Sequence, residues 1–153
     1  MAAIVLASYL IISGCAGSGR AYEGTAKAPE TIAVIKGSGS AVTERVLIDV
    51  VDGKMFSPSL TEVEVLPGRR MMTVRYVDMV HCIPLIECLT PTTYLYSTNV
   101  EVDAEAGHTY QFQGEGSWAN QPDPINLRLL DMDTNEAVWQ TKIDSSRPTY
   151  ILK

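Results

Sequence analysis

The sequence predicts an all-β protein, an antiparallel β-sandwich of about seven short strands that follows a cleavable N-terminal leader. After Pro29 the chain consists of short segments rich in Val, Ile, Thr and Tyr, separated by clusters of Gly, Pro, Asn, Asp and Ser. No segment repeats its apolar residues every three to four positions, as a surface helix would. Two packed sheets are therefore expected, and an α/β fold, which needs helices between strands, is not.

The first strands are expected between Thr31 and Leu66. Asp52 and Gly53 predict a turn behind the second of them. Pro67 and Gly68 favour a type II turn after the third, because Pro fixes the first φ and Gly accepts a positive second φ. The predicted strands are Thr31 to Ile35, which ends at the run from Gly37 to Ser40, then Val42 to Val51 and Val63 to Leu66.

Two longer strands follow, from Arg69 to Asp78 and from Tyr94 to Ala104. Both alternate between apolar and polar side chains, so one face of each should lie in the core and the other in water. The residues predicted to face the core are Met72, Val74, Tyr76, Val100, Val102 and Ala104.

A hairpin and a final pair of strands complete the predicted domain. Gly107 turns the chain, and Tyr110 and Phe112 continue an apolar face in the next strand. Trp139 is expected in the core, because it alternates with other inward positions of the last strand. The remaining elements are a loop from Gly114 to Pro124, a strand from Ile125 to Leu130, a turn from Asp131 to Asn135, and a strand from Ala137 to Ile143.

Residues 1–14 are predicted to be a lipoprotein signal peptide. Ala2 to Ile12 form an uncharged apolar run, too short for a permanent span, which needs about 20 residues. Ile12, Ser13, Gly14 and Cys15 resemble the bacterial lipobox, in which a branched apolar residue and two small residues precede the cysteine. We therefore expect cleavage before Cys15 and attachment of diacylglycerol and palmitate-type acyl chains to this residue. A buried N-terminal strand or helix is the open alternative.

Residues 15–28 are predicted to be a lipidated tether, and residues 29–153 a single β-sandwich domain. The tether is rich in Gly, Ala and Ser, although Tyr22, Glu23 and Gly24 are not typical linker residues and leave docking open. Ala16, rather than Asp, follows Cys15, which favours the outer membrane, with the domain facing the periplasm. The formal net charge of −6 argues against a nucleic-acid partner. It also predicts that the lipid alone makes the membrane contact.

Cys82 and Cys88 are expected to form a disulfide, because the envelope is oxidising and two thiols remain once Cys15 is acylated. His81, Cys82, Cys88 and His108 offer zinc's preferred ligand atoms, but the usual close spacing is absent and we predict no metal. Asp131, Asp133 and Asn135 imitate the first half of a calcium loop. A calcium loop that started at Asp131 would need Gly at its sixth position and Glu at its twelfth, where this chain has Glu136 and Lys142. We therefore interpret the segment as a turn without a bound ion.

The sequence supports no active site. The two histidines have no recognisable nucleophile beside them, and the carboxylates occur at strand spacing on faces expected to be solvated. Trp118, with nearby Asn120 and Asp123, is the candidate partner or ligand loop. The alternative is that Trp118 folds over an open end of the sandwich, as large aromatic residues usually become buried.

Three stretches together resemble a group of small bacterial lipoproteins of unknown function. They are the Leu-Pro-Gly-Arg turn at residues 66–69, the Ala-Gly-His-Thr-Tyr hairpin at 106–110, and the final hairpin from Leu129 to Trp139, preceded by the Tyr-Glu-Gly segment at 22–24. The resemblance implies a fold and a compartment and carries no catalytic residue. Arg70 stands where many members carry His.

These observations predict a non-enzymatic, lipid-anchored lipoprotein of the bacterial envelope that requires no cofactor. Its partners are expected to be the membrane, through Cys15, and another envelope protein, bound through loops or an exposed sheet edge. A small-ligand or glycan binder that uses the Trp118 loop is the alternative.

Overall fold

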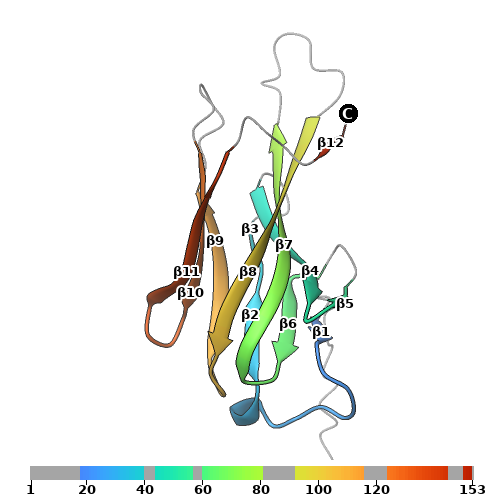
Figure 1. The fold of residues 1–153 in the computed structure, drawn as a ribbon, viewed down its shortest axis with the longest axis vertical. Helices are drawn as coiled ribbons and strands as arrows, with labels where there is room; N and C mark the ends of the chain where they lie inside the picture. Colours follow the sequence, from blue (N-terminus) through green and yellow to red (C-terminus); the bar gives the residue numbers. More distant parts are fainter. Residues whose placement is uncertain are drawn as a thin grey trace, which may run out of the picture.

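The fold consists of two β-sheets that face one another (Figure 1). The structure, a computed structural model, describes residues 18–39, 44–56, 60–80, 92–115, 124–144 and 150–152. Within these ranges the chain forms twelve strands, one 3-10 helix (η1, Pro29–Thr31) and no α-helix, so the predicted all-β class is confirmed. In the same ranges no helix has the length and apolar character needed to cross a membrane.

The first sheet has six strands in the order β1-β6-β2-β9-β10-β11. Its strand β1 runs parallel to β6, and β2 runs parallel to β9, while the other neighbours are antiparallel. The prediction of purely antiparallel pairing was wrong here, because side chains alternate in the same way in parallel and antiparallel strands. The strands are β1 (Ser18–Arg20), β2 (Ala33–Lys36), β6 (Glu62–Val65), β9 (Thr109–Glu115), β10 (Ile125–Asp131) and β11 (Glu136–Ile143).

The second sheet is antiparallel, with the order β12-β8-β7-β4-β3 and with β5 paired to β4. The long hairpin of β7 and β8 pairs from Gly68 and Ala104 at one end to Val80 and Thr92 at the other. Its strands are β3 (Ser38–Gly39), β4 (Glu44–Val51), β5 (Lys54–Met55), β7 (Gly68–Val80), β8 (Thr92–Ala104) and β12 (Tyr150–Leu152).

The strand count exceeds the predicted seven or so because of four very short strands, β1, β3, β5 and β12. Each has two or three residues. A segment of this length is too short to show the alternation from which strands are recognised. The eight longer strands correspond to the eight segments that the sequence pattern indicated.

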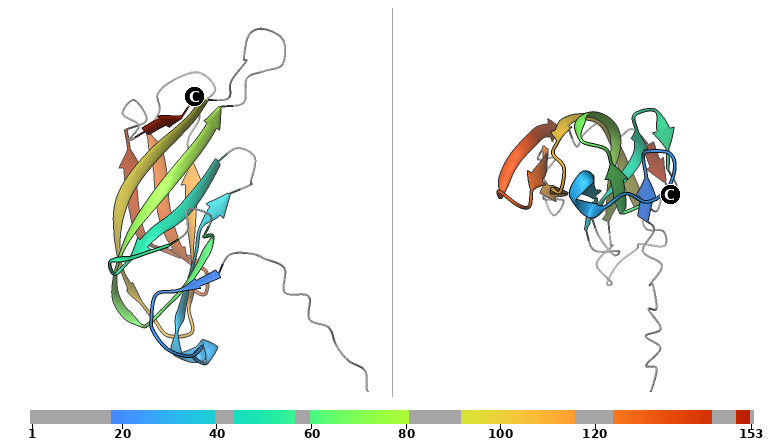
Figure 2. Two further views of the ribbon diagram at one scale, coloured as in Figure 1. Left: turned by 90° about the vertical axis from the view of Figure 1, so that its right-hand side faces the viewer. Right: turned by 90° about the horizontal axis from the view of Figure 1, so that it is seen from below.

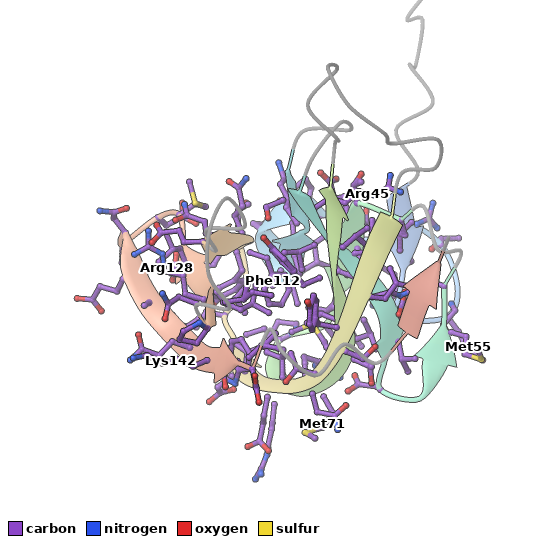
Figure 3. The ribbon with its side chains drawn as sticks, turned by 90° about the horizontal axis from the view of Figure 1, so that it is seen from above. Arg45, Met55, Met71, Phe112, Arg128 and Lys142 are labelled. Atoms are coloured by element: carbon purple, nitrogen blue, oxygen red, sulfur yellow. The ribbon has the colours of Figure 1, made fainter. Side chains whose placement is uncertain are left out.

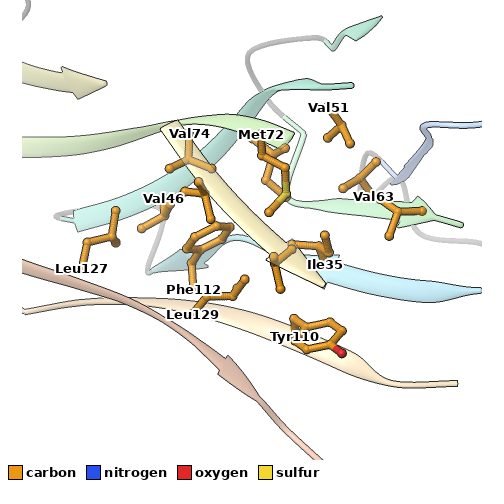
Figure 4. Packing of buried hydrophobic residues seen from close by; sticks show 14 of the residues in the cluster. Ile35, Val46, Val51, Val63, Met72, Val74, Tyr110, Phe112, Leu127 and Leu129 are labelled. Atoms are coloured by element: carbon orange, nitrogen blue, oxygen red, sulfur yellow. The ribbon is translucent and has the colours of Figure 1, made fainter. Parts of the chain in front are cut away.

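One apolar core lies between the two sheets (Figure 4). Phe112 of β9 and Val74 of β7, from opposite sheets, are both fully buried. Trp139 of β11 is only partly buried and meets the Phe112 ring edge-on, with ring centroids 6.5 Å apart. The residues predicted to face the core from β7 and β8 are all buried, which confirms the expected orientation: Met72, Val74, Tyr76, Val100, Val102 and Ala104.

Part of the expected tether is packed onto the first sheet. Ser18–Arg20 form β1 and pair with β6, and Tyr22 is buried with its hydroxyl donating to Glu64 at 2.5 Å. Strand pairing and the Tyr22 contact thus bind Ser18 to Tyr22 of the predicted tether to the domain, the docking that the sequence left open. Figure 2 shows β1 beside the first sheet.

Candidate functional site

A shallow hollow of about 410 Å³ lies where β9, β10 and β11 present polar side chains. Register explains how these side chains meet: Asn126 lies opposite Lys142, and Arg128 lies opposite Gln140. The hollow is lined by Glu115, Asn126, Leu127, Arg128, Gln140, Thr141 and Lys142. Figure 3 shows Arg128 and Lys142 at the β10 and β11 end of the molecule, away from Phe112 in the interior.

Arg128 is held in place by its neighbours on β9. Its Nε and Nη2 donate to Gln113 Oε1 at 3.1 and 2.8 Å, and Nη2 also contacts Glu115 Oε1 at 3.0 Å. The guanidinium side chain remains 43 % exposed. It is thus oriented by these bonds and still accessible to a ligand, the combination that a binding site requires.

The charge of the hollow differs from that of the whole chain. Arg128 and Lys142 contribute two positive charges and Glu115 one negative charge, whereas the chain carries a formal net charge of −6. Gln140, Asn126 and Thr141 add amide and hydroxyl groups that donate and accept hydrogen bonds. This lining suits a polar or anionic ligand, and its volume is within the usual range for small-molecule sites.

Several strands at the edges of the two sheets are short. The edge strands β1, β3 and β12 have two or three residues each. The fourth edge strand, β11, is longer, but its register with β10 shifts opposite Val138, and it carries Lys142. Short edges, bulges and edge lysines are the features by which proteins prevent strand addition. In the second sheet β12 pairs only with Thr93 to Leu95 of the 13-residue strand β8. The expected sheet-edge interface therefore stays a prediction.

A second polar cluster joins two turns at one end of the sheets. His108, behind the Gly107 turn, contacts Asp131 at the end of β10, with Nδ1 and Oδ2 2.8 Å apart. Asp131 is 4 % exposed, and its Oδ1 accepts the N–H groups of Asp133 and Thr134. Asp133 Oδ2 accepts the N–H of Thr109 at 2.9 Å. The cluster fastens the β8–β9 turn to the β10–β11 turn.

The hydrogen bond between His108 and Asp131 stabilises the charged form of each side chain. The hydrogen bond to Asp131 raises the pKa of His108, against the opposing effect of partial burial. Burial opposes the ionisation of Asp131, but the hydrogen bonds from His108, Asp133 and Thr134 outweigh it and lower the pKa of this carboxyl. The structure thus places His108 at the Gly107 turn, paired with Asp131.

His108, Asp131 and Asp133 also offer three ligand atoms within 4.8 Å of one another. Their oxygen and nitrogen atoms are already engaged by one another and by the backbone N–H groups of both turns. A cation would have to displace these hydrogen bonds. We therefore interpret the cluster as a structural contact that joins the two turns.

The remaining predicted site residues lie outside the described residues. They are the lipidation site Cys15, the disulfide pair Cys82 and Cys88, and the loop residues Trp118, Asn120 and Asp123. The lipidation, the disulfide and the loop site stay predictions.

Sequence reasoning did not identify the hollow. The only indication in the sequence was that polar residues alternate with apolar ones. On β10 Asn126 and Arg128 point outward while Leu127 and Leu129 are buried. On β11 Gln140 and Lys142 are polar residues on either side of Thr141. Such positions are ordinary for any strand with one solvated face. Only the register of β9, β10 and β11 shows that these side chains line one hollow.

Comparisons of the chain with protein-family models, with curated proteins and with solved structures found no match.

Proposed function

We propose that this chain is a lipid-anchored lipoprotein of the bacterial envelope, held at the outer membrane and facing the periplasm. Its domain, a β-sandwich in this proposal, acts as a non-enzymatic binding module for another envelope protein. The lipobox-like run that ends at Cys15 and the resemblance to small lipoproteins support the compartment.

The observation that carries the binding role is the hollow on β10 and β11. Arg128 is oriented by Gln113 and Glu115 yet accessible, and Lys142 lies in the same lining. Six of its seven lining residues carry side chains that donate or accept hydrogen bonds, which suit recognition of a polar partner. The envelope partner in this proposal presents acidic or amide groups to this face.

Substituting Cys15 with serine is expected to move the protein from the membrane fraction to the soluble fraction, because the hydroxyl cannot take the thioether-linked diacylglycerol. Fractionation of cells followed by immunoblotting measures this shift. Cys82→Ser is the matched control and should leave the protein in the membrane fraction. Membrane retention of the Cys15→Ser variant would show that the lipid anchor is not what holds the protein.

A second candidate function, binding of a small ligand or glycan, is favoured by the position of the hollow in the chain. Glu115 of the lining directly precedes residues 116–123, and Pro124 and Ile125 lead from them back to Asn126. This segment carries Trp118, Asn120 and Asp123, the candidate loop residues. The second candidate is therefore a small ligand or glycan bound in the hollow, next in sequence to these residues.

Arg128→Ala is expected to weaken binding at the hollow about tenfold or more, because it removes hydrogen bonds from a charged group. Binding of acidic and neutral oligosaccharides and capture of envelope proteins should be measured in parallel, together with Trp118→Ala. Arg69→Ala is the control, since Arg69 is an exposed arginine on the other sheet, paired with Glu101. Loss of glycan binding alone selects the second candidate, and loss of protein capture alone selects the first. If neither changes, the hollow is not the binding site.

A further inference from the structure

The short distance in sequence between Cys15 and the start of β1 limits how far the domain can lie from the membrane. This inference rests on the proposed lipidation of Cys15. Ser18 begins β1, and only two residues lie between it and Cys15. A fully extended chain covers about 11 Å over these three steps. The β1 edge of the first sheet must therefore lie close to the bilayer.

Strand β5 lies beside β1 at this edge. Lys54 Nζ donates to the backbone carbonyl of Arg20 at 2.7 Å, and Phe56, which follows β5, packs against Gly19. We call the surface formed by Arg20, Lys54 and Met55 the β1–β5 corner.

The corner combines exposed cations with an exposed apolar side chain. Met55 is 81 % exposed, the highest value among the exposed large hydrophobic residues of the described chain. Arg20 of β1 and Lys54 of β5 are exposed at the same edge. The nearby carboxylate of Glu64 is engaged by Tyr22 and Arg20, and that of Asp52 by Arg70. Cations next to an apolar side chain match the boundary between lipid headgroups and acyl chains.

We propose that the β1–β5 corner rests on the bilayer surface beside the lipid anchor. Met55 enters the headgroup region, and Arg20 and Lys54 contact lipid phosphates. This contact replaces the sequence-based expectation that an acidic domain touches the membrane only through its lipid. The net charge of −6 does not prevent it, because Arg20 and Lys54, set against the Glu64 carboxylate, leave one net positive charge at the corner.

The contact also orients the hollow away from the bilayer. In the first sheet β1 and β11 are the two edge strands, separated by five strand spacings of about 4.8 Å, or about 24 Å. Figure 3 shows Met55 on one side of the molecule and Arg128 and Lys142 on the other. The hollow is thus presented to the periplasm, where a partner can reach it.

The test uses the full lipidated chain in vesicles of phosphatidylethanolamine and phosphatidylglycerol. A polarity-sensitive fluorophore is attached at Met55→Cys or at Lys142→Cys, in a Cys82→Ser, Cys88→Ser background, and lipids brominated near the headgroup act as quenchers. We expect a blue shift and loss of fluorescence at position 55 and neither at position 142. If Met55→Cys or Lys142→Cys does not have the melting temperature of the wild type, the fluorophore is attached instead at Lys54→Cys in the corner or at Val138→Cys on β11.

Quenching at position 142 equal to that at position 55, or quenching at neither, overturns the proposed contact. The Cys15→Ser chain separates this failure from failure of the anchor. If that chain no longer binds vesicles while the lipidated chain binds without quenching at position 55, the anchor stands and the orientation is wrong. If the Cys15→Ser chain binds equally well, the lipidation on which the inference rests is itself wrong.

Discussion

Replacing Gly37 with alanine is expected to lower the free energy of unfolding by about 3 kcal/mol. Gly37 joins β2 of the first sheet to β3 of the second. A Cβ atom here would lie 2.2 Å from the Val46 carbonyl oxygen, far inside van der Waals contact. Both backbones are fixed, since β4 is paired on either side and the Gly37 N–H donates to the Thr61 carbonyl at 2.7 Å. Urea denaturation of the purified domain measures the change.

Gly19→Ala is the matched control for this prediction. Its Cβ would meet side-chain atoms of Leu60 and Phe56 at 3.0 Å, and side chains can move where a paired backbone cannot. We expect a loss of about 1 kcal/mol or less. Equal losses for the two variants would show that the approach of Gly37 to β4 is not what makes glycine necessary.

Replacing Asp131 with alanine is expected to cost about 2 to 3 kcal/mol. The side chain is buried and receives hydrogen bonds from His108 and from the N–H groups of Asp133 and Thr134. Alanine leaves these donors without their acceptor and loosens the attachment of the β10–β11 turn. Thermal and urea denaturation measure the loss. Asp133→Ala, which removes one exposed bond to the Thr109 N–H, should cost about 1 kcal/mol or less.

The same pair gives this stabilisation a defined dependence on pH. The pKa of Asp131 is lowered in the folded protein, so its contribution is present above its ordinary value of 3.8 and is lost as the pH falls through the lowered value. The pKa of His108 is raised, so its contribution is present below 6.5 and is lost as the pH rises through the raised value. Glu105 and Asp133 also face His108 and act in the same direction.

The stability difference between the wild type and Asp131→Asn should therefore be largest between about pH 4 and pH 6.5 and should shrink on both sides. Asparagine keeps the size and an acceptor oxygen but removes the charge. A difference that does not vary with pH would mean that the His108–Asp131 contact contributes through hydrogen bonding alone.

The strands whose side chains alternate over many residues can be predicted from the sequence alone. In β7 and β8, for example, burial of Met72, Val74, Val100 and Val102 follows from period-two alternation, because a strand with one face in the core must place every second residue there. The turns at Gly53, Gly68 and Gly107 were equally readable, since each requires a positive φ that glycine adopts without strain. The lipobox-like run at Cys15 is also a property of sequence alone.

The identity of neighbouring strands, and of the side chains that their pairing brings together, follows from the three-dimensional fold. The parallel pairing of β1 with β6, the docking of Tyr22 on Glu64, and the contact of His108 with Asp131 join residues between 23 and 44 positions apart. Alternation does not reveal these partners, because it specifies the face of a side chain and not the neighbouring strand. The hollow around Arg128 and the β1–β5 corner both arise from register and sheet order, which are fixed by burying one common core rather than by any local pattern of residues.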